Sequence, residues 1–379
     1  MIRARRISCA VVVAVAALLA AVFAAHAHAS TLYVGNNGVD GSGCGDATRP
    51  CRSIGQAVAL ASGGDRIVVG PGLYGDLSGD GSFGGAGDEA PPGDCACMIK
   101  VDRRLTIESS AGAAATVIDT GANTRLRAVR IQAPNAVFGT RNKGFTVRAS
   151  SGLGIEVAEN DVRVESNIVF GGLLVQSEGA ELVGNTATGA RQGFIVANGR
   201  ATLTGNVARA ATEDGFLLHG DNEVRGNVAT GNGLRGFRII DAGRSSVTGN
   251  IAMGNGADGL TLASGDNVEV RGNTFAANGQ AGVRVIGIFA HPPLVSRNNF
   301  LGNGSRGDST TGLFGCGIVN ELGALVKATG NFWGTAAGPT GGSPADRVCN
   351  GVASTTSAGS VAANQFPIPV TPAMGGNRG

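Results

Sequence analysis

The chain has 379 residues, a net charge of +2 at neutral pH, and an aromatic content of 4%. Residues 1–29 read as a secretory signal peptide: Arg3, Arg5 and Arg6 form the charged region, an apolar run follows, and Ala27 to Ala29 fits a cleavage site. Without these three arginines the net charge is near −1. A global basic field is therefore missing, which excludes nucleic acid as a partner.

The signal peptide predicts a secreted or periplasmic protein that is cleaved after Ala29. Its apolar region, Cys9 to Ala25, has 17 residues and is short for a stable membrane span. No later segment is apolar for long enough to cross a membrane, so we expect no span in the mature chain. Whether the destination is the periplasm or the medium stays open.

Residues 30–98 are assigned to an N-terminal cap and the first coils. The segment Ser53–Ser62 predicts a short helix, which Ser53 caps and which has one apolar face. The strand Arg66–Val69 follows, and the glycine- and aspartate-rich residues 76–94 predict a loop. A solenoid needs such a cap because its terminal coil exposes core.

Asparagine recurs in one register through the second half of the chain. Seven of the eight asparagines follow a strand-like stub, and the steps between them are 18, 21, 21, 23, 23, 25 and 33 residues. A repeat of this size built from short strands is typical of a solenoid. We expect these side chains to form a structural ladder: Asn167, Asn185, Asn206, Asn227, Asn250, Asn273, Asn298 and Asn331.

Upstream of each ladder asparagine, a glycine begins a run of alternating apolar residues. Alternation predicts that one side chain points inward and the next outward. The repeats contain no stretch of helical spacing long enough for a crossover helix, so parallel strands must wind as a β-helix. Residues 99–340 are assigned to these repeats and 341–379 to a C-terminal tail. Five residues after the ladder, a second partial ladder runs through Asn232, Asn255, Asn278 and Asn303.

Six cysteines follow the signal peptide, and an even number in an exported chain indicates disulfides. Cys44 and Cys51 can close an N-terminal loop, and Cys316 and Cys349 can tie the tail to the last coil. Cys95 and Cys97 are too close in sequence to pair easily.

The chain resembles the bacterial exported right-handed parallel β-helix repeat proteins of the pectin-lyase-like superfamily. The resemblance rests on Leu32-Tyr33-Val34, the segment Cys51 to Tyr74, the asparagine coils, and the closing pattern Asn331-Phe332-Trp333-Gly334 with Gly338-Pro339. It implies an all-β, single-stranded right-handed solenoid with a short N-terminal capping helix. It also implies that any enzymatic site lies on the outer face of one strand column.

The catalytic constellations of such enzymes are missing. Neither the paired aspartates of the hydrolases nor the Asp-Pro-His-Glu motif of alginate epimerases occurs, and no lysine stands in the outward column. We expect no cofactor and no metal site; Ca²⁺ stays open as an alternative, although no motif supports it. The scarcity of His and Met sets aside a third class with this fold, periplasmic copper delivery in nitrous oxide respiration.

One arrangement of charged residues remains as a candidate site. The outward column contains Glu156, Leu174, Ile195, Leu217, Arg238, Thr261 and Arg284, and beside it stack Asp214, Arg235 and Asp258. Arg238 and Arg284 lie two coils apart, about 10 Å along the axis. His219 is outward by parity and is a candidate general base, and Arg238 is a candidate catalytic residue that neutralises the carboxylate of the substrate.

Two interpretations of this column stay open. In the first, it is a groove for an acidic extracellular polysaccharide, and the protein binds this glycan or acts on it as a lyase or hydrolase. In the second, it is a solvated face of mixed charge, and the protein is a non-catalytic solenoid with a binding or structural role. The oligomeric state stays open as well.

Overall fold

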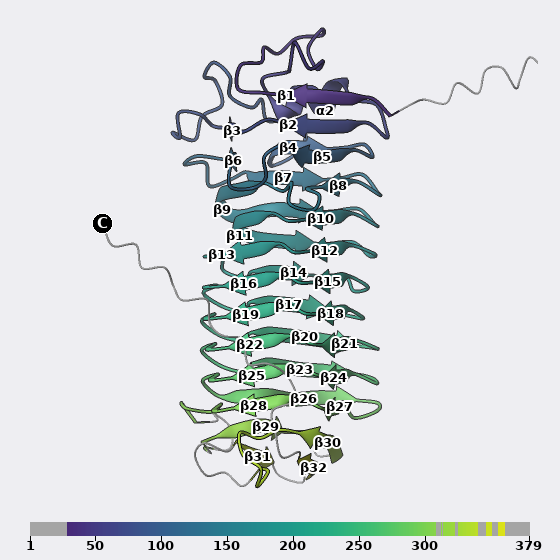
Figure 1. Cartoon of the computed structure of the whole chain (residues 1–379), viewed down its shortest axis with the longest axis vertical. Helices are drawn as coiled ribbons and strands as arrows, with labels where there is room; N and C mark the ends of the chain where they lie inside the picture. The colour runs from purple at the N-terminus through teal and green to yellow at the C-terminus, as the bar shows by residue number, and fades with distance from the viewer. Residues whose placement is uncertain are drawn as a thin grey trace, which may run out of the picture.

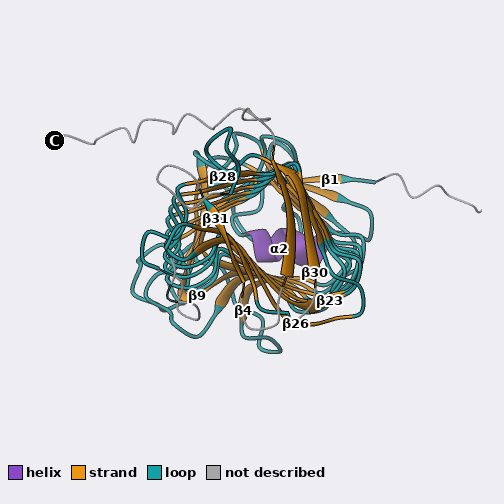
Figure 2. Ribbon diagram, turned by 90° about the horizontal axis from the view of Figure 1, so that it is seen from below, coloured by secondary structure: helices purple, strands orange, loops and turns teal. Residues whose placement is uncertain are grey.

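The protein is a right-handed parallel β-helix with one short helix at its N-terminal end (Figure 1). The computed structural model describes residues 29–307, 312, 314–322, 325–339 and 346–350, and the backbone alone for 355–360. Seen along the axis, three strand stacks enclose a central core, and helix α2 (Ile54–Leu60) lies across it (Figure 2). The expected signal peptide falls almost wholly outside the described residues.

Sheet 1 has thirteen parallel strands. They are β1 (Thr31–Val34), β2 (Arg66–Val69), β5 (Thr106–Ser109), β8 (Val137–Phe138), β10 (Arg163–Glu165), β12 (Glu181–Val183), β15 (Thr202–Thr204), β18 (Glu223–Arg225), β21 (Ser246–Thr248), β24 (Glu269–Arg271), β27 (Leu294–Ser296), β30 (Leu325–Asn331) and β32 (Thr355–Ser360).

From residue 168 to residue 301, each strand of sheet 2 begins directly after a ladder asparagine. The strands of sheet 2 are β3 (Gly72–Gly75), β6 (Thr116–Asp119), the first parts of β9 (Thr146–Val157) and β11 (Ile168–Val175), β13 (Thr186–Thr188), β16 (Val207–Arg209), β19 (Val228–Thr230), β22 (Ile251–Met253), β25 (Thr274–Ala276) and β28 (Asn299–Leu301).

Sheet 3 carries the outward column that the sequence singled out. Its strands are β4 (Cys97–Val101), β7 (Arg127–Ile131), the second parts of β9 and β11, β14 (Phe194–Val196), β17 (Phe216–His219), β20 (Phe237–Ala242), β23 (Leu260–Gly265), β26 (Ala281–Phe289), β29 (Cys316–Asn320) and β31 (Arg347–Asn350). β31 and β32 lie inside residues 341–379, so strand pairing continues into the segment that the sequence assigned to a tail.

The asparagine ladder forms as expected. Each side-chain amide donates from Nδ2 to Oδ1 of the asparagine one coil later, at 3.0–3.1 Å, from Asn167 to Asn331. The same Oδ1 accepts the backbone N–H of the preceding ladder residue, as Asn250 does for Asn227 at 2.8 Å. Turn backbone that is buried between coils thus finds its partners in the neighbouring coil.

Aromatic side chains stack inside the coil in the register that the alternation predicts. The Phe194, Phe216 and Phe237 rings are fully buried, and successive centroids lie 4.7 and 4.6 Å apart. Toward the C-terminal end, Phe300 stacks on Trp333 at 4.8 Å, and Trp333 is fully buried. The one tryptophan of the chain therefore packs into the last described layer of the core.

The N-terminal cap is held by polar groups from both sides. Ser53 caps α2 by accepting a hydrogen bond from the Gln56 N–H at 3.2 Å. Glu89, from the loop at residues 76–94, accepts the N–H groups of Ile54 and Gly55 at 2.6 and 2.8 Å. Burial raises the pKa of Glu89 to about 7 despite these two donors. The loop is thus fastened to the helix.

Candidate functional site

The outward column of sheet 3 is continuous in the structure. Strand register places Leu217 beside Arg238, Arg238 beside Thr261, and Thr261 beside Arg284. The predicted directions of these side chains hold, because inward neighbours such as Phe237 are fully buried. The structure thus assembles the predicted column. Its side chains differ in the hydrogen-bond and ion-pair partners that they contact.

Arg284 is buried within an ion-pair network. Its side chain is 7% exposed, its Nε donates to Asp258 Oδ2 at 2.9 Å, and its Nη1 pairs with Glu321. Thr261 is also buried, and its hydroxyl donates to the same Asp258 oxygen at 2.8 Å. Arg284 and Thr261 are therefore bound to the protein itself and contribute fixed charge and shape to the site.

Asp214, Arg235 and Asp258 stack on consecutive coils beside this network. Arg235 Nη1 lies 3.5 Å from Asp214 Oδ1, and the Arg235 backbone N–H donates to that oxygen at 3.2 Å. Asp214 and Asp258 are almost fully buried. Two buried atoms, Arg235 Nε and Asp258 Oδ1, have no hydrogen-bond partner among the described residues. The stack alternates in sign, which stabilises it between coils.

Arg238 differs from these cations. It is half-buried, and it forms no ion pair with any residue that the structure describes. Its neighbours on the face are the half-buried Leu217 on the preceding coil and the buried Thr261 on the next one. Ile240, two residues further along the same strand, is half-buried as well. A guanidinium in this setting keeps its five donors available for a ligand.

His219 lies one coil before Arg238, and register places it beside Ile240. Its backbone carbonyl accepts the Asn222 side-chain amide at 2.9 Å, whereas its imidazole has no hydrogen-bond partner among the described residues. The structure thus brings His219 and Arg238 to one face and adds no carboxylate that would orient the imidazole.

The N-terminal part of the same face is neutralised. Glu156 is almost fully buried and pairs with Arg127 Nε at 2.6 Å and with Arg130 Nε at 3.5 Å. Between this cluster and Arg238, the half-buried side chains of Leu174, Ile195 and Leu217 follow one another on successive coils. The face therefore offers an axial apolar strip that ends at Arg238.

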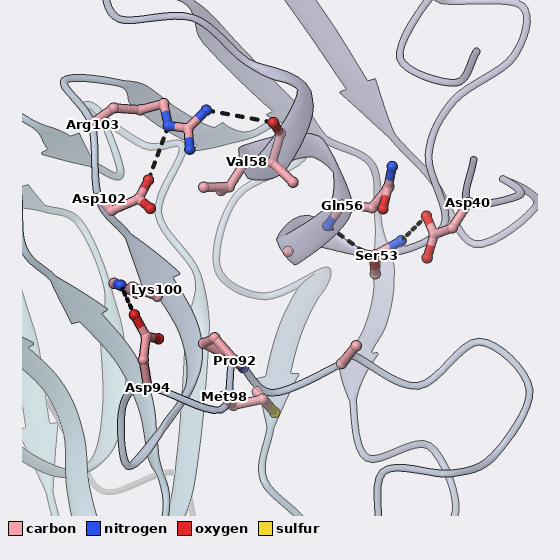
Figure 3. A pocket seen from close by; sticks show the side chains of 13 residues that line it. Asp40, Ser53, Gln56, Val58, Pro92, Asp94, Met98, Lys100, Asp102 and Arg103 are labelled. Atoms are coloured by element: carbon pink, nitrogen blue, oxygen red, sulfur yellow. Dashed lines mark hydrogen bonds and ion pairs between the residues drawn. The ribbon is translucent and has the colours of Figure 1, made fainter. Parts of the chain in front are cut away.

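A cavity of about 590 Å³ lies beside the N-terminal cap (Figure 3). The ion pairs of Lys100 with Asp94 and of Arg103 with Asp102 line one side, and the start of α2 lines the other. Met98 contributes the one sulfur atom of the lining. Because each cation in the lining has its own carboxylate, this cavity carries no unbalanced positive charge.

The two predicted disulfides form: Cys44 bonds to Cys51 and Cys316 bonds to Cys349. The expectation for the remaining pair was wrong, because Cys95 also bonds to Cys97. The chain bends between them and brings their Cα atoms to 5.3 Å, within the range that a disulfide spans.

Sequence reasoning missed three carboxylates that the structure uses. Glu89 caps the helix, Glu321 pairs with Arg284, and Asp346 accepts the Asn303 N–H at 3.0 Å and its side-chain amide at 2.6 Å. Burial raises the pKa of Asp346 to about 7. Asp346 thus ends the second asparagine ladder. It lies 43 residues beyond Asn303, which does not fit the repeat length, so the periodicity of the sequence did not predict it.

Among the described residues, one group of His, Cys, Asp and Glu has ligand atoms close enough together for a metal ion: Asp40, Cys44 and Cys51. The two cysteines are bonded to each other, and Asp40 accepts the N–H groups of Arg52 and Ser53 at 2.8 and 3.0 Å. Metal ligation by Cys requires the thiolate, so this group does not fit a metal ion. Within the described part of the chain, no helix is long and apolar enough to cross a membrane.

Solved structures share the fold of this chain at low sequence identity. The A-module of the mannuronan C-5 epimerase AlgE4 from Azotobacter vinelandii is 14% identical, with a TM-score of 0.46 over 82% of this chain and 93% of that one. The periplasmic alginate epimerase AlgG has 14% identity and a TM-score of 0.37 over 78% and 77%. Pectate lyase Pel9A has 16% identity and a TM-score of 0.33 over 88% and 78%. At these identities the likeness concerns the fold alone.

No curated protein matches the sequence. A family model does: the one described as periplasmic copper-binding protein (NosD) matches residues 122–338, which is more than half of the chain and contains the whole asparagine ladder. The sequence had set aside the copper-delivery class on its few His and Met residues, and the match corrects this at the level of the family. The chain therefore belongs to the NosD family.

Proposed function

We propose that this protein is an exported, ligand-binding β-helix that holds an acidic polysaccharide along the outer face of sheet 3. The observation that supports the proposal is the state of Arg238, which stands on this face without a carboxylate partner among the described residues. The neighbouring cations Arg235 and Arg284 are neutralised by Asp214, Asp258 and Glu321.

The shape of the face suits an extended polymer. Leu174, Ile195 and Leu217 form a strip along the axis, one residue per coil, and Arg238 continues it on the next coil. The apolar side chains offer contact area to the C–H faces of sugar rings, and the guanidinium matches a carboxylate in bidentate geometry. In this assignment the buried Thr261, Arg284, Asp214 and Asp258 support the site.

Binding fits the site better than catalysis does. A general base works when it is oriented toward the proton that it removes and when its own second nitrogen has a partner. The His219 imidazole has no such partner in the described structure. The two buried aspartates of the stack, Asp214 and Asp258, are not adjacent, because the coil of Arg235 lies between them. Lyase chemistry by His219 and Arg238 is therefore the secondary hypothesis.

The test is calorimetric titration of the mature protein with polygalacturonate and with alginate. Arg238→Ala is expected to weaken binding about tenfold or more, because it removes a charge-assisted hydrogen bond. Arg209→Ala, which removes an exposed arginine from sheet 2, is the matched control and should bind like the unaltered protein. Equal affinity of the Arg238→Ala protein would refute the proposed face.

The same samples test for lyase activity, since β-elimination creates an unsaturated product that absorbs ultraviolet light. We expect no such product. If the unaltered protein forms the unsaturated product and the His219→Ala protein does not, the function is catalysis rather than binding.

Copper binding is the second candidate, and the family match is what favours it. Copper(I) prefers thiolate and thioether ligands, and imidazole also suits copper. The described residues do not fit such a site: the six cysteines form three disulfides, His219 lies on β17, and His291 is an exposed residue whose Nδ1 lies 2.7 Å from Asp266. Dialysis of the oxidised protein against copper(I) or copper(II), followed by metal analysis, should leave less than one copper per chain. One tightly held copper would make this candidate the primary function.

A further inference from the structure

The outer corner where sheet 1 turns into sheet 2 lies on a different side of the β-helix from the outward column. A cavity of about 450 Å³ opens there, and its lining includes Thr248, Ile251, Arg271, Thr274 and Arg297. Register places Thr248 beside Arg271 on sheet 1 and Ile251 beside Thr274 on sheet 2. Residues from three successive coils thus converge on one space, which is called the corner pocket below.

The corner pocket carries an excess of positive charge. Arg271 pairs with Glu269 on its own strand, and both side chains remain partly exposed, at 46% and 39%. Arg297 is exposed and forms no ion pair with a described residue. Of the two guanidinium groups, only that of Arg271 has a carboxylate partner among the described residues, and this carboxylate occupies only part of its donors.

The backbone of Arg297 is held in a conformation that disfavours a side chain. In most coils the residue before the ladder asparagine is a glycine in the left-handed region, such as Gly249 with φ 65° and Gly272 with φ 67°. Arg297 takes this place in its coil with φ 55°. Glycine would relieve this strain, and a strained residue that adds charge to a pocket points to a role in that pocket.

Hydroxyl groups and an apolar wall complete the lining. The Thr248 hydroxyl oxygen is buried and has no hydrogen-bond partner among the described residues. Thr274 Oγ1 accepts the Asn299 side-chain amide at 3.2 Å, which leaves its own O–H to donate. Ile251 supplies apolar surface between them. Glycines at positions 249 and 272 also lie in the lining.

We propose that the corner pocket binds the carboxylate-bearing ring of an acidic sugar. Arg271 and Arg297 hold the carboxylate, and Ile251 contacts the C–H face of the ring. The volume favours a ring over a bare ion, because ligand pockets of about 300 Å³ and more hold molecules rather than single anions. This site does not use Arg238 and stands independently of the face proposed above.

The experiment titrates a trimer of galacturonic acid into the Arg238→Ala protein, so that the sheet 3 face does not contribute. In this background, Arg297→Gly and Arg271→Ala should each weaken binding about tenfold or more, and Arg209→Ala should not. Arg297→Gly should also melt at a temperature at least as high as its parent, because it relieves backbone strain, which shows that lost binding is not lost folding.

Four results would overturn the proposal. The first is the absence of trimer binding, and the second is unchanged affinity in both arginine variants. Another is equal binding of the methyl-esterified trimer, which has no charge. The last is full displacement of the trimer by an equal concentration of inorganic phosphate, which would leave a bare oxyanion site instead of a sugar site.

Discussion

Individual side chains on the outer face of sheet 3 share a direction but differ in their partners. Arg284 and Arg238 both point outward from the same column, two coils apart. Arg284 is neutralised by Asp258 and Glu321, whereas Arg238 has no carboxylate among the described residues. The availability of a charge for a ligand is thus decided residue by residue, after the fold has set the direction.

Glu89 makes stability depend on pH. Its folded pKa of about 7 lies above the ordinary value of 4.5, so the folded protein binds more protons between these values. The stability that this protonation provides is complete below pH 4.5 and is lost as pH rises through 7. Each such group changes the unfolding free energy by at most about 1.4 kcal/mol per pH unit.

The prediction is tested by urea unfolding of Glu89→Gln at several pH values between 5 and 8. The variant should lose less stability with rising pH than the unaltered protein does. Some dependence should remain, since burial also raises the pKa of Asp346 to about 7. Parallel pH profiles of the two proteins would show that Glu89 titrates normally in the folded state.

At the scale of elements, strands gain their stability from the ladders that they place in register. The strands β14, β17 and β20 have only three to six residues each, too few to stand alone. The centroids of their successive rings, Phe194 to Phe216 and Phe216 to Phe237, lie 4.7 and 4.6 Å apart, so the middle strand is held by the two beside it.

Truncation of the middle ring should therefore be costly. Phe216→Ala is expected to lower the unfolding free energy by about 3–5 kcal/mol, because it opens a cavity between two rings. Leu217→Ala, at the adjacent half-buried outward position, is the control and should cost clearly less. Urea denaturation of both variants measures the difference, and similar losses would mean that the aromatic stack does not dominate the packing.

At the scale of the whole molecule, the features that could be predicted from the sequence are those that recur from coil to coil. The ladder asparagines, the inward phenylalanines and the outward column all recur with each coil, so a single error in register would have broken the pattern. The ion pair of Arg284 with Glu321, the cap by Glu89 and the ladder end at Asp346 each occur once. These contacts join residues that are 34 to 43 positions apart in the sequence, across segments of irregular length. The periodicity of the sequence therefore does not predict them.

The same limit applies to the two binding proposals. The alternation of apolar residues predicts that the Arg238 side chain points outward. Whether this side chain has an ion-pair partner depends on the positions of all nearby carboxylates in the folded chain. The corner pocket was not visible in the sequence, because it needs the turn geometry of three coils together. The sequence showed only that Arg297 stands where a glycine usually precedes the ladder asparagine.

The asparagine ladders also give the solenoid a direction. In both ladders the amide-to-amide hydrogen bonds all run toward the C-terminal end, so the dipoles of these bonds add rather than cancel, and hydrogen bonds in such a row polarise one another. A row of this kind ends in an unsatisfied donor, which is the positive end. Asp346 supplies a carboxyl group as acceptor at that point. The two ends of the β-helix are therefore not equivalent: a further coil added after the last one must first offer an acceptor, whereas one added at the other end must offer a donor.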